Sequence, residues 1–205
     1  ERTRAPFSRY SGASEVMEST VPLAKLLLRA DPGVWGGEAS SSDGVSVLRS
    51  TNFKDDGTLD LSRLAYRQIP ARKAISKYLA PGDILLERSG GGPKQPVGRV
   101  CQYLGDDSSH VFGNFCQRLR ANGSVCLPRY LFWNLFWLHA SGVTVQLQKQ
   151  TTGIRNLLYK EYLATQVRLP GLSEQRRIVE LLDQADALRQ QRRAADEKAK
   201  RILPA

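Results

Sequence analysis

One stretch near the C-terminus constrains the fold of this chain more than any other feature. Residues 173–203 contain neither glycine nor proline, and helix-forming residue types dominate them. Ser173 lies where a helix N-cap is expected, and Glu174 would fall in the positive first turn. At about 1.5 Å per residue, such a helix is about 45 Å long, which exceeds the width of a domain of this size. The sequence therefore predicts a long helix that needs a partner beyond its own domain.

The apolar residues of this stretch recur mostly at three-and-four spacing, which is typical of a helix face that packs against another helix. They form a narrow seam, and the opposite faces are charged. We therefore expect an antiparallel coiled coil and a homodimer; the alternative is a terminal helix that packs on its own domain. The expected dimerisation residues are Ile178, Leu181, Leu182, Ala185, Leu188, Ala195 and Ile202.

The chain carries a formal net charge of +10, and most of this excess lies outside the long helix. Residues 173–203 hold eight basic and six acidic side chains, which leaves a net charge of +8 for the rest of the chain. Such an excess on a small domain indicates a polyanionic partner, most often nucleic acid. The basic surface is therefore expected on the domain and not on the helix.

Length and composition favour a single soluble domain. With 205 residues, of which 41% are hydrophobic, the chain can bury one real core. It has no run of about 18 apolar residues and no signal-peptide core after its first residues, so we expect a cytoplasmic protein without membrane contact. Cys101, Cys116 and Cys126 are odd in number and lack C-x-x-C spacing, which favours buried free thiols over disulfides or a zinc site.

The elements expected along the chain describe an α+β fold, a mixed α/β recognition domain with a β-rich core followed by the long helix. We divide the chain into a lead-in (1–18), a domain (19–171) and the helix (172–205), and expect a chain ending at Gly171 to fold. Glycine-rich loops are expected over 88–96 and 150–155, the second leading into a short helix at Asn156. Helices are expected over 20–29, 72–78 and 128–140, and strands over 45–50, 84–87, 97–103, 110–119, 143–147 and 165–169.

Catalytic motifs are scarce. The sequence has no H-E-x-x-H, G-x-S-x-G or phosphate-loop pattern, and no cofactor or metal is predicted. His139 ends an aromatic-rich helix and is interpreted as structural. Asp83 and Glu87 flank a predicted strand in the manner of a metal-dependent nuclease, but Arg88 stands where the lysine of such a site would be. A metal-dependent nuclease is therefore kept as a hypothesis, behind the two that are given below.

The two predicted glycine-rich loops carry the residue types that read DNA. Arginine, asparagine and glutamine make paired hydrogen bonds to purine edges, and serine, threonine and lysine bind phosphates. Glycine lets the backbone approach a phosphate closely. The expected DNA-binding residues are Arg49, Asn52, Arg88, Ser89, Lys94, Gln95, Arg99, Gln150, Thr151, Thr152, Arg155 and Asn156.

Several segments together resemble one known family. VPLAKLL at 21–27, GVSVLRSTN at 44–52, LAPGDILLERSGG at 79–91 and PVGR at 96–99 are similar to segments of a target-recognition domain of type I restriction-modification specificity subunits. The most specific match is VRLPGLSEQRRIVELLD at 167–183, which resembles the family's junction into its conserved helix. The resemblance covers about residues 20–203.

This resemblance implies a non-catalytic subunit that reads DNA. Members of the family carry two recognition domains separated by an antiparallel pair of helices, and each domain reads one half of a split DNA site. Methyltransferase subunits bind around the helices, and a restriction subunit joins the assembly. The present chain has one domain and one helix, so it is either a half-size subunit that homodimerises or part of a longer one. A coiled-coil assembly or adaptor protein without DNA specificity is the alternative.

Overall fold

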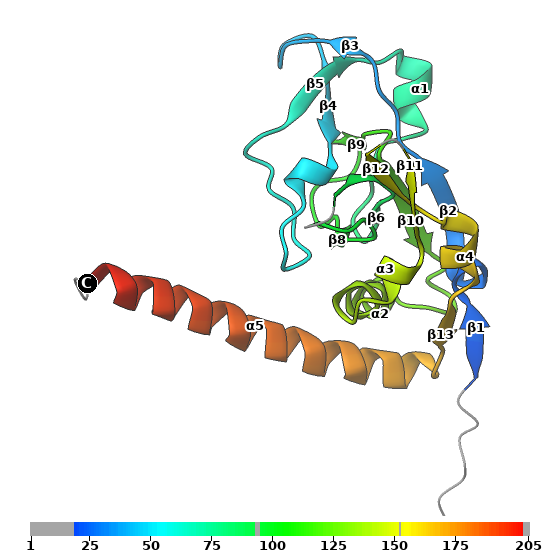
Figure 1. Cartoon of the computed structure of the whole chain (residues 1–205), viewed down its shortest axis with the longest axis vertical. Helices are drawn as coiled ribbons and strands as arrows, with labels where there is room; N and C mark the ends of the chain where they lie inside the picture. Colours follow the sequence, from blue (N-terminus) through cyan, green and yellow to red (C-terminus); the bar gives the residue numbers. More distant parts are fainter. Residues whose placement is uncertain (1–18, 93–94, 152, 203–205) are drawn as a thin grey trace, which may run out of the picture.

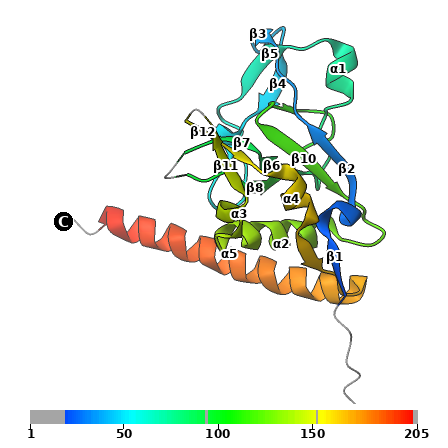
Figure 2. The ribbon, with the colours of Figure 1, turned by 45° about the vertical axis from the view of Figure 1, so that its right-hand side comes forward.

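The computed structural model describes residues 19–92, 95–151 and 153–202, and the expected lead-in lies outside this part. A β-rich body carries short helices, and one long helix, α5 (Leu172–Ile202), leaves it at one end (Figures 1 and 2). The α+β class and the long C-terminal helix are thereby confirmed. The pairing of α5 in a coiled coil stays a prediction.

The central sheet has the strand order β2-β10-β6-β8, and all its neighbours are antiparallel. The strand β6 is buried at every position, as its continuous apolar run predicts. The helix α2 packs against β8 and β10, where its leucine and aromatic side chains join the main hydrophobic cluster. The strands are β2 (Leu27–Pro32), β6 (Ile84–Glu87), β8 (Val100–Gln102) and β10 (Cys116–Ala121), and the helix is α2 (Pro128–Ala140).

A second sheet, with the order β3-β5-β4-β9, forms the end of the body that lies farthest from α5 (Figure 1). Its pair β4–β9 is parallel, whereas the other two pairs are antiparallel. A short helix, α1 (Ala71–Ile75), follows β5, and the buried side chain of Ala74 joins a small cluster with Val47 and Val111. The strands are β3 (Gly37–Glu38), β4 (Val45–Leu48), β5 (Ala65–Gln68) and β9 (Val111–Phe112).

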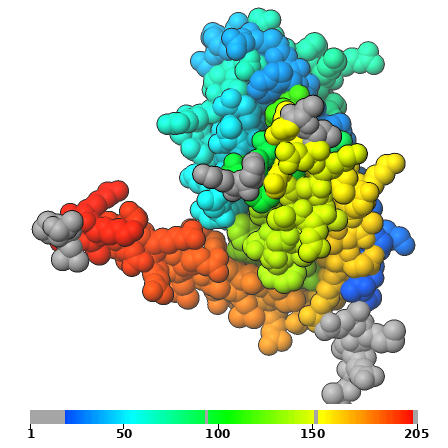
Figure 3. Space-filling model, viewed as in Figure 1, coloured from blue at the N-terminus to red at the C-terminus, as the bar shows by residue number. Residues whose placement is uncertain are grey.

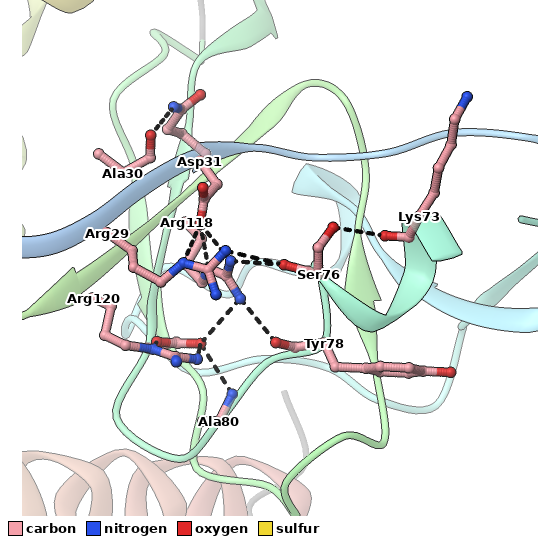
Figure 4. Close-up of polar contacts among 11 residues, drawn as sticks. Arg29, Ala30, Asp31, Lys73, Ser76, Tyr78, Ala80, Arg118 and Arg120 are labelled. Atoms are coloured by element: carbon pink, nitrogen blue, oxygen red, sulfur yellow. Dashed lines mark hydrogen bonds and ion pairs between the residues drawn. The ribbon is translucent and has the colours of Figure 1, made fainter. Parts of the chain in front are cut away.

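A fully buried arginine joins the central sheet to the segment that follows α1. Arg118, on β10, is 0% exposed and pairs with Asp31 of β2 (Figure 4). Its Nη1 donates to the carbonyl of Tyr78 at 2.8 Å, and its Nη2 donates to the carbonyl of Ser76 at 3.1 Å. Since these carbonyls follow α1, the guanidinium ties the end of that helix to the central sheet. Buried charge is tolerated where every donor is satisfied in this way.

Smaller elements complete the body. The strand β1 (Thr20–Pro22) pairs with β13 (Gln166–Arg168), which brings the start of the described chain beside the start of α5. A three-stranded sheet of order β11-β12-β7 lies on the body (Figure 2). Its strands are β7 (Ser89–Gly91), β11 (Gln148–Thr151) and β12 (Ile154–Leu157), and the remaining helical turns are η1 (Leu23–Leu26), η2 (Ser50–Asn52), α3 (Val143–Gln146) and α4 (Tyr159–Ala164).

The first turns of α5 are packed on the domain. Gln175 is 0% exposed, and its amide donates to the carbonyls of Val125 at 2.9 Å and Pro170 at 2.8 Å. Ile178 and Val179 pack against the main cluster. Asp183 accepts from Trp133 Nε1 of α2 at 2.8 Å. These contacts tie the first three turns of α5 to the domain. That a chain ending at Gly171 folds stays a prediction.

Three sequence-based predictions are wrong. The segment 20–29 is not a helix but β1, η1 and the start of β2, because its backbone is taken up by ladders to β13 and β10. The segment 143–147 is not a strand but the helical turn α3, which follows Gly142 at φ 81°. The loop at 150–155 is a β-hairpin whose turn contains Gly153 at φ 83°, and Asn156 lies in β12 rather than at a helix start.

Other predictions are confirmed. Helix α2 has the predicted bounds, and α1 (Ala71–Ile75) overlaps the helical turn predicted over 72–78 but ends three residues earlier. The predicted strands at 84–87, 97–103 and 165–169 contain β6, β8 and β13, and the predicted strand at 110–119 is divided into β9 and β10. Cys101, Cys116 and Cys126 are buried free thiols.

Candidate nucleic-acid interface

The two loops that the sequence singled out lie side by side. Strand β7, in the first loop, pairs with β12 of the hairpin, and Gly91 stands opposite Arg155. The Ser89 hydroxyl donates to Asn156 Oδ1 at 2.6 Å, so a hydrogen bond joins the two loops directly. More than 60 residues separate these segments in the sequence. The fold thus brings together three expected contact residues, Ser89, Arg155 and Asn156.

A third segment, η2, meets the first loop across an open hollow of about 320 Å³. Ser50 and Thr51 line it from η2, and Gly90, Gln95 and Arg99 line it from the loop. Thr51 and Gln95 are exposed. Ser50 and Thr51 also line a second hollow, of about 350 Å³, together with Arg49. We call these two hollows with the adjoining β7–β12 pair the recognition face.

Two expected contact residues serve the fold. Asn52 is 1% exposed, and its amide donates to the carbonyls of Asp60 at 2.8 Å and Arg63 at 3.1 Å. Arg99 Nε donates to Glu87 Oε2 at 2.8 Å, and its Nη2 donates to the Ser50 carbonyl at 3.1 Å. Burial alone would lower the pKa of Arg99, but the hydrogen bond and charge of Glu87 raise it above its usual value. Both side chains hold η2 in place beneath the recognition face.

The other expected contacts have different surroundings. Arg88 lies over the ring of Tyr159 in α4, with its Cζ 5.3 Å from the ring centroid. Gln150 is exposed on β11 and stands opposite the half-buried Arg155. Thr151 belongs to β11 and stands opposite Ile154. Lys94 and Thr152 lie outside the described residues.

Two aromatic residues on the same face were not selected from the sequence. Trp35 and Phe115 line the second hollow, although 42% and 46% of their surfaces are exposed. The guanidinium of Arg67 lies over the Trp35 ring, 4.2 Å from its centroid. The sequence signal for them is weak, because an aromatic residue in a short strand or beside a glycine is more often part of a core.

The expected dimerisation residues divide into two groups along α5. Ile178 packs on the domain, and Leu182 lines a groove with Tyr130, Trp133 and Trp137 of α2. Leu181, Leu188 and Ile202 are at least 58% exposed. Ala185 and Ala195 are exposed as well. The last turns of α5 extend beyond the body (Figure 3), whereas Asp186 and Gln190 line a hollow with Asp56 and Leu61 of the domain. The exposed Leu181, Leu188 and Ile202 stay the expected dimer contacts.

The carboxylates of the nuclease hypothesis are both occupied. Asp83 is 1% exposed and accepts from Arg120 Nε at 2.6 Å and Nη2 at 2.7 Å, while Glu87 accepts from Arg99. Within residues 19–92, 95–151 and 153–202, no group of three histidine, cysteine or acidic side chains could hold a metal ion. The carboxylate oxygens of both residues accept hydrogen bonds from arginines and are therefore not arranged to bind a metal ion. His139 accepts or donates one bond to Thr144 Oγ1 at 2.8 Å, in keeping with a structural role.

Solved structures of other proteins have a similar fold. The chain resembles a chain of HsdS from Thermoanaerobacter tengcongensis, with a TM-score of 0.58 and 15% identity, over 90% of this chain and 47% of that one. A chain from a study of complex assembly and conformational transition of the type I R-M system gives a TM-score of 0.57 and 23% identity, over 95% and 46%. The S subunit of a type I system from M. genitalium gives 0.54 and 13%, over 85% and 40%. The chain has the fold of a type I specificity subunit.

Sequence comparison points to the same family. The chain is 25% identical over 134 residues to the type I restriction enzyme MjaX specificity subunit of Methanocaldococcus jannaschii. That stretch is 65% of this chain and 31% of the relative, so the chain spans about a third of the curated relative and under half of the solved chains. No family model matches the chain. The resemblance to type I specificity subunits is thereby confirmed.

One further observation concerns the helices. Among the residues that the structure describes, no helix combines the length and the apolar character needed to cross a membrane.

Proposed function

We propose that this chain is a non-catalytic DNA-recognition subunit, or part of one, in a type I restriction-modification complex. Its domain would read one half of a split double-stranded DNA site through the recognition face. A methyltransferase subunit, and with it a restriction subunit, would dock on the assembly. The chain would form a homodimer through the outer half of α5.

The observation that carries this proposal is the convergence on the recognition face. Arg49, Ser89, Gln95, Arg155 and Asn156 come from three segments far apart in the sequence, and the fold gathers them around one open surface. Arginine and amide side chains with adjoining hydroxyls can contact base edges and phosphates at the same time. The net charge of +8 outside the long helix favours a polyanion over a neutral ligand.

The fold supports the same proposal from a second direction. The solved chains that resemble this one are specificity subunits, and each is about twice as long as the matched part. Two copies of this chain, joined by antiparallel pairing of α5, would supply two recognition faces. Dimeric DNA readers match the spacing of half-sites to the symmetry of the protein, so a bipartite site suits this arrangement.

A selection from random-sequence duplex DNA tests the proposal. The chain, alone and with its methyltransferase subunit, is incubated with the pool, and bound duplexes are sequenced and checked by mobility shift. We expect a split sequence to be enriched, and its affinity to fall steeply with salt because phosphate contacts release counterions. Replacing Arg155 with Ala should weaken binding by about 1–3 kcal/mol, as expected for a base contact.

The adaptor hypothesis gives the opposite outcome. The apolar groove between α2 and α5 favours a helical partner and would serve a protein that binds no DNA sequence. If no sequence is enriched with or without the methyltransferase subunit, the adaptor hypothesis replaces the proposed function.

A further inference from the structure

The hollow between Trp35 and Phe115 is an unusual surface for a basic domain. Two exposed aromatic rings line it, together with Gly113, Asn114 and Cys116. Exposing apolar surface costs about 25 cal/mol per Å², so two such rings at one hollow mark a contact site more often than chance exposure. The hollow belongs to the recognition face, because Ser50 and Thr51 line both this hollow and the neighbouring one at Gln95.

The Trp35 segment is held rigidly against the turn that carries Phe115. Gly33 N donates to the carbonyl of Cys116 at 3.1 Å, and Val34 N donates to the carbonyl of Phe112 at 2.8 Å. The backbones approach so closely that a Cβ on Gly33 would lie 2.0 Å from the Gly113 oxygen. The backbone segments that carry the two rings are therefore fixed relative to each other.

The backbone of Phe115 is also hydrogen-bonded to the start of the first glycine-rich loop, at Arg88 and Ser89. Its carbonyl accepts from Arg88 N at 2.8 Å and Ser89 N at 3.2 Å. Its ring lies against Gly90, where a Cβ would come within 3.1 Å of the ring and where φ is +100°. A preorganised aromatic group loses little conformational entropy on binding, which suits a specific contact.

The rim favours DNA as the occupant. Arg49 lines the hollow, and Arg67, which pairs with Glu38 at 3.3 Å, lies over the Trp35 ring, so positive side chains lie at the hollow. A ligand that fits must present a small apolar group close to negative charge. In the major groove of DNA, the base edges offer one such group, the 5-methyl of thymine, and aromatic side chains contact it in DNA complexes.

We propose that the hollow between Trp35 and Phe115 receives the 5-methyl group of one thymine in the recognised half-site, so that these rings determine specificity at that position. This inference rests on the proposed function and names one of its base contacts. Arg49 would bind the adjacent phosphate or base edge, and the β7–β12 pair would contact neighbouring bases.

Single replacements of thymine by deoxyuridine test the inference, because each removes only one methyl group. The probe is the duplex obtained by selection with the full chain, and affinity is measured by fluorescence anisotropy with the methyltransferase subunit present where it is needed. We expect one replacement in each half-site to weaken binding about threefold to tenfold, as the burial of one methyl group predicts. The other replacements should change affinity less than twofold.

Variants assign that penalty to the two rings. In Phe115→Ala and Trp35→Ala, binding to the thymine duplex should weaken and the penalty at the sensitive position should disappear. Phe115→Leu should keep part of the penalty, because it keeps an apolar surface, and it serves where the alanine variant fails to fold. Leu104→Ala is the matched control, since Leu104 is 70% exposed and lies outside the recognition face.

Four outcomes would overturn the inference. They are a half-site without thymine, a wild-type protein that tolerates every deoxyuridine, a Phe115→Ala variant that keeps the full penalty, and a rise in 2-aminopurine fluorescence at the contacted step. The last would mean that a ring inserts between bases and does not contact a methyl group. Each differs from the failure of the proposed function, in which no sequence is enriched at all.

Discussion

At the scale of single residues, the buried arginine Arg118 links several parts of the fold. It pairs with Asp31, contacts Asp83 at 3.9 Å and satisfies two carbonyls beyond α1. Replacing Arg118 with Ala leaves these groups buried without their donor, which costs about 3–5 kcal/mol. Urea unfolding followed by circular dichroism measures this loss. Arg29→Ala is the control, because the half-exposed Arg29 pairs with the same Asp31 and should contribute about 0–1 kcal/mol.

Asp31 makes the stability of the domain depend on pH. Burial alone would raise the pKa of its carboxyl, but the hydrogen bond and charge of Arg118, helped by Arg29 and Lys77, hold it below the usual value. A group with a lowered folded pKa adds stability above its unfolded pKa of about 3.9, and that stability is lost as the pH falls through the folded value. When unfolding is measured between pH 2 and 7, the urea concentration at the midpoint should therefore decrease once the pH is below about 4. The decrease should be less steep in Asp31→Asn. Equal slopes in both proteins would show that this carboxyl is not the source.

The residue scale also shows what the sequence could not predict about the recognition face. Arginine, asparagine and glutamine were selected by type, and type does not reveal burial. Asn52 and Arg99 have the chemistry of base-reading residues, yet backbone carbonyls and Glu87 take up their donors. The sequence does not predict Trp35 and Phe115 as contact residues, because an aromatic residue type does not reveal whether its side chain is exposed or buried. Only the close approach of Gly33 and Gly113 brings these two rings to one hollow.

At the scale of elements, sequence prediction succeeded where local pattern and tertiary packing agree. Helix α2 opens with Pro128 and closes at Gly142 after an apolar run, and its predicted bounds are those observed. The segment 20–32 has a leucine run that suits a helix, but ladders to β13 and β10 decide its conformation. Those partners lie about 90 to 150 residues away in the chain, which no local pattern can report.

The first turns of α5 belong to the fold of the domain. A chain that ends after Gly171 loses the three hydrogen bonds of the buried Gln175 and the packing of Ile178 and Val179. We expect its free energy of unfolding to fall by about 3–5 kcal/mol. A chain that ends after Gln190 keeps all of these contacts and should stay within about 1 kcal/mol of the full chain. Chemical denaturation of both compares them, and equal stability would place the domain boundary at Gly171.

The exposed side of α5 is the proposed dimer seam. Leu181 and Leu188 are 58% and 66% exposed, so replacing both with Asp should leave the fold of the single chain intact. If they form the dimer seam, the double variant should be monomeric by light scattering at concentrations where the wild type is a dimer. Ala187→Asp with Ala194→Asp is the matched control, because it adds the same charges at the same spacing on another side of the helix. A dimeric Leu181→Asp, Leu188→Asp variant would exclude the seam.

At the scale of the whole molecule, the proposed function assigns separate tasks to the recognition face and the long helix. The face sits on the body, and the outer half of α5 extends away from it (Figure 1). In an antiparallel pair, this helix would set the distance between two faces and their rotation about the DNA. The spacer between the half-sites is then fixed by the protein, because a rigid helix does not stretch.

Changing the spacer of the selected site tests that geometry. Adding five base pairs turns the second half-site by about half a turn of the duplex, so that one dimer cannot engage both. Linked binding raises affinity by about 10²–10⁴ over a single contact, so we expect the lengthened site to bind at least about a hundredfold more weakly. The Leu181→Asp, Leu188→Asp variant provides the comparison: as a monomer it should bind both sites alike, at the level of one half-site. If the wild type also ignores the spacer, α5 does not set the distance between the two faces, even where each face still reads its half-site.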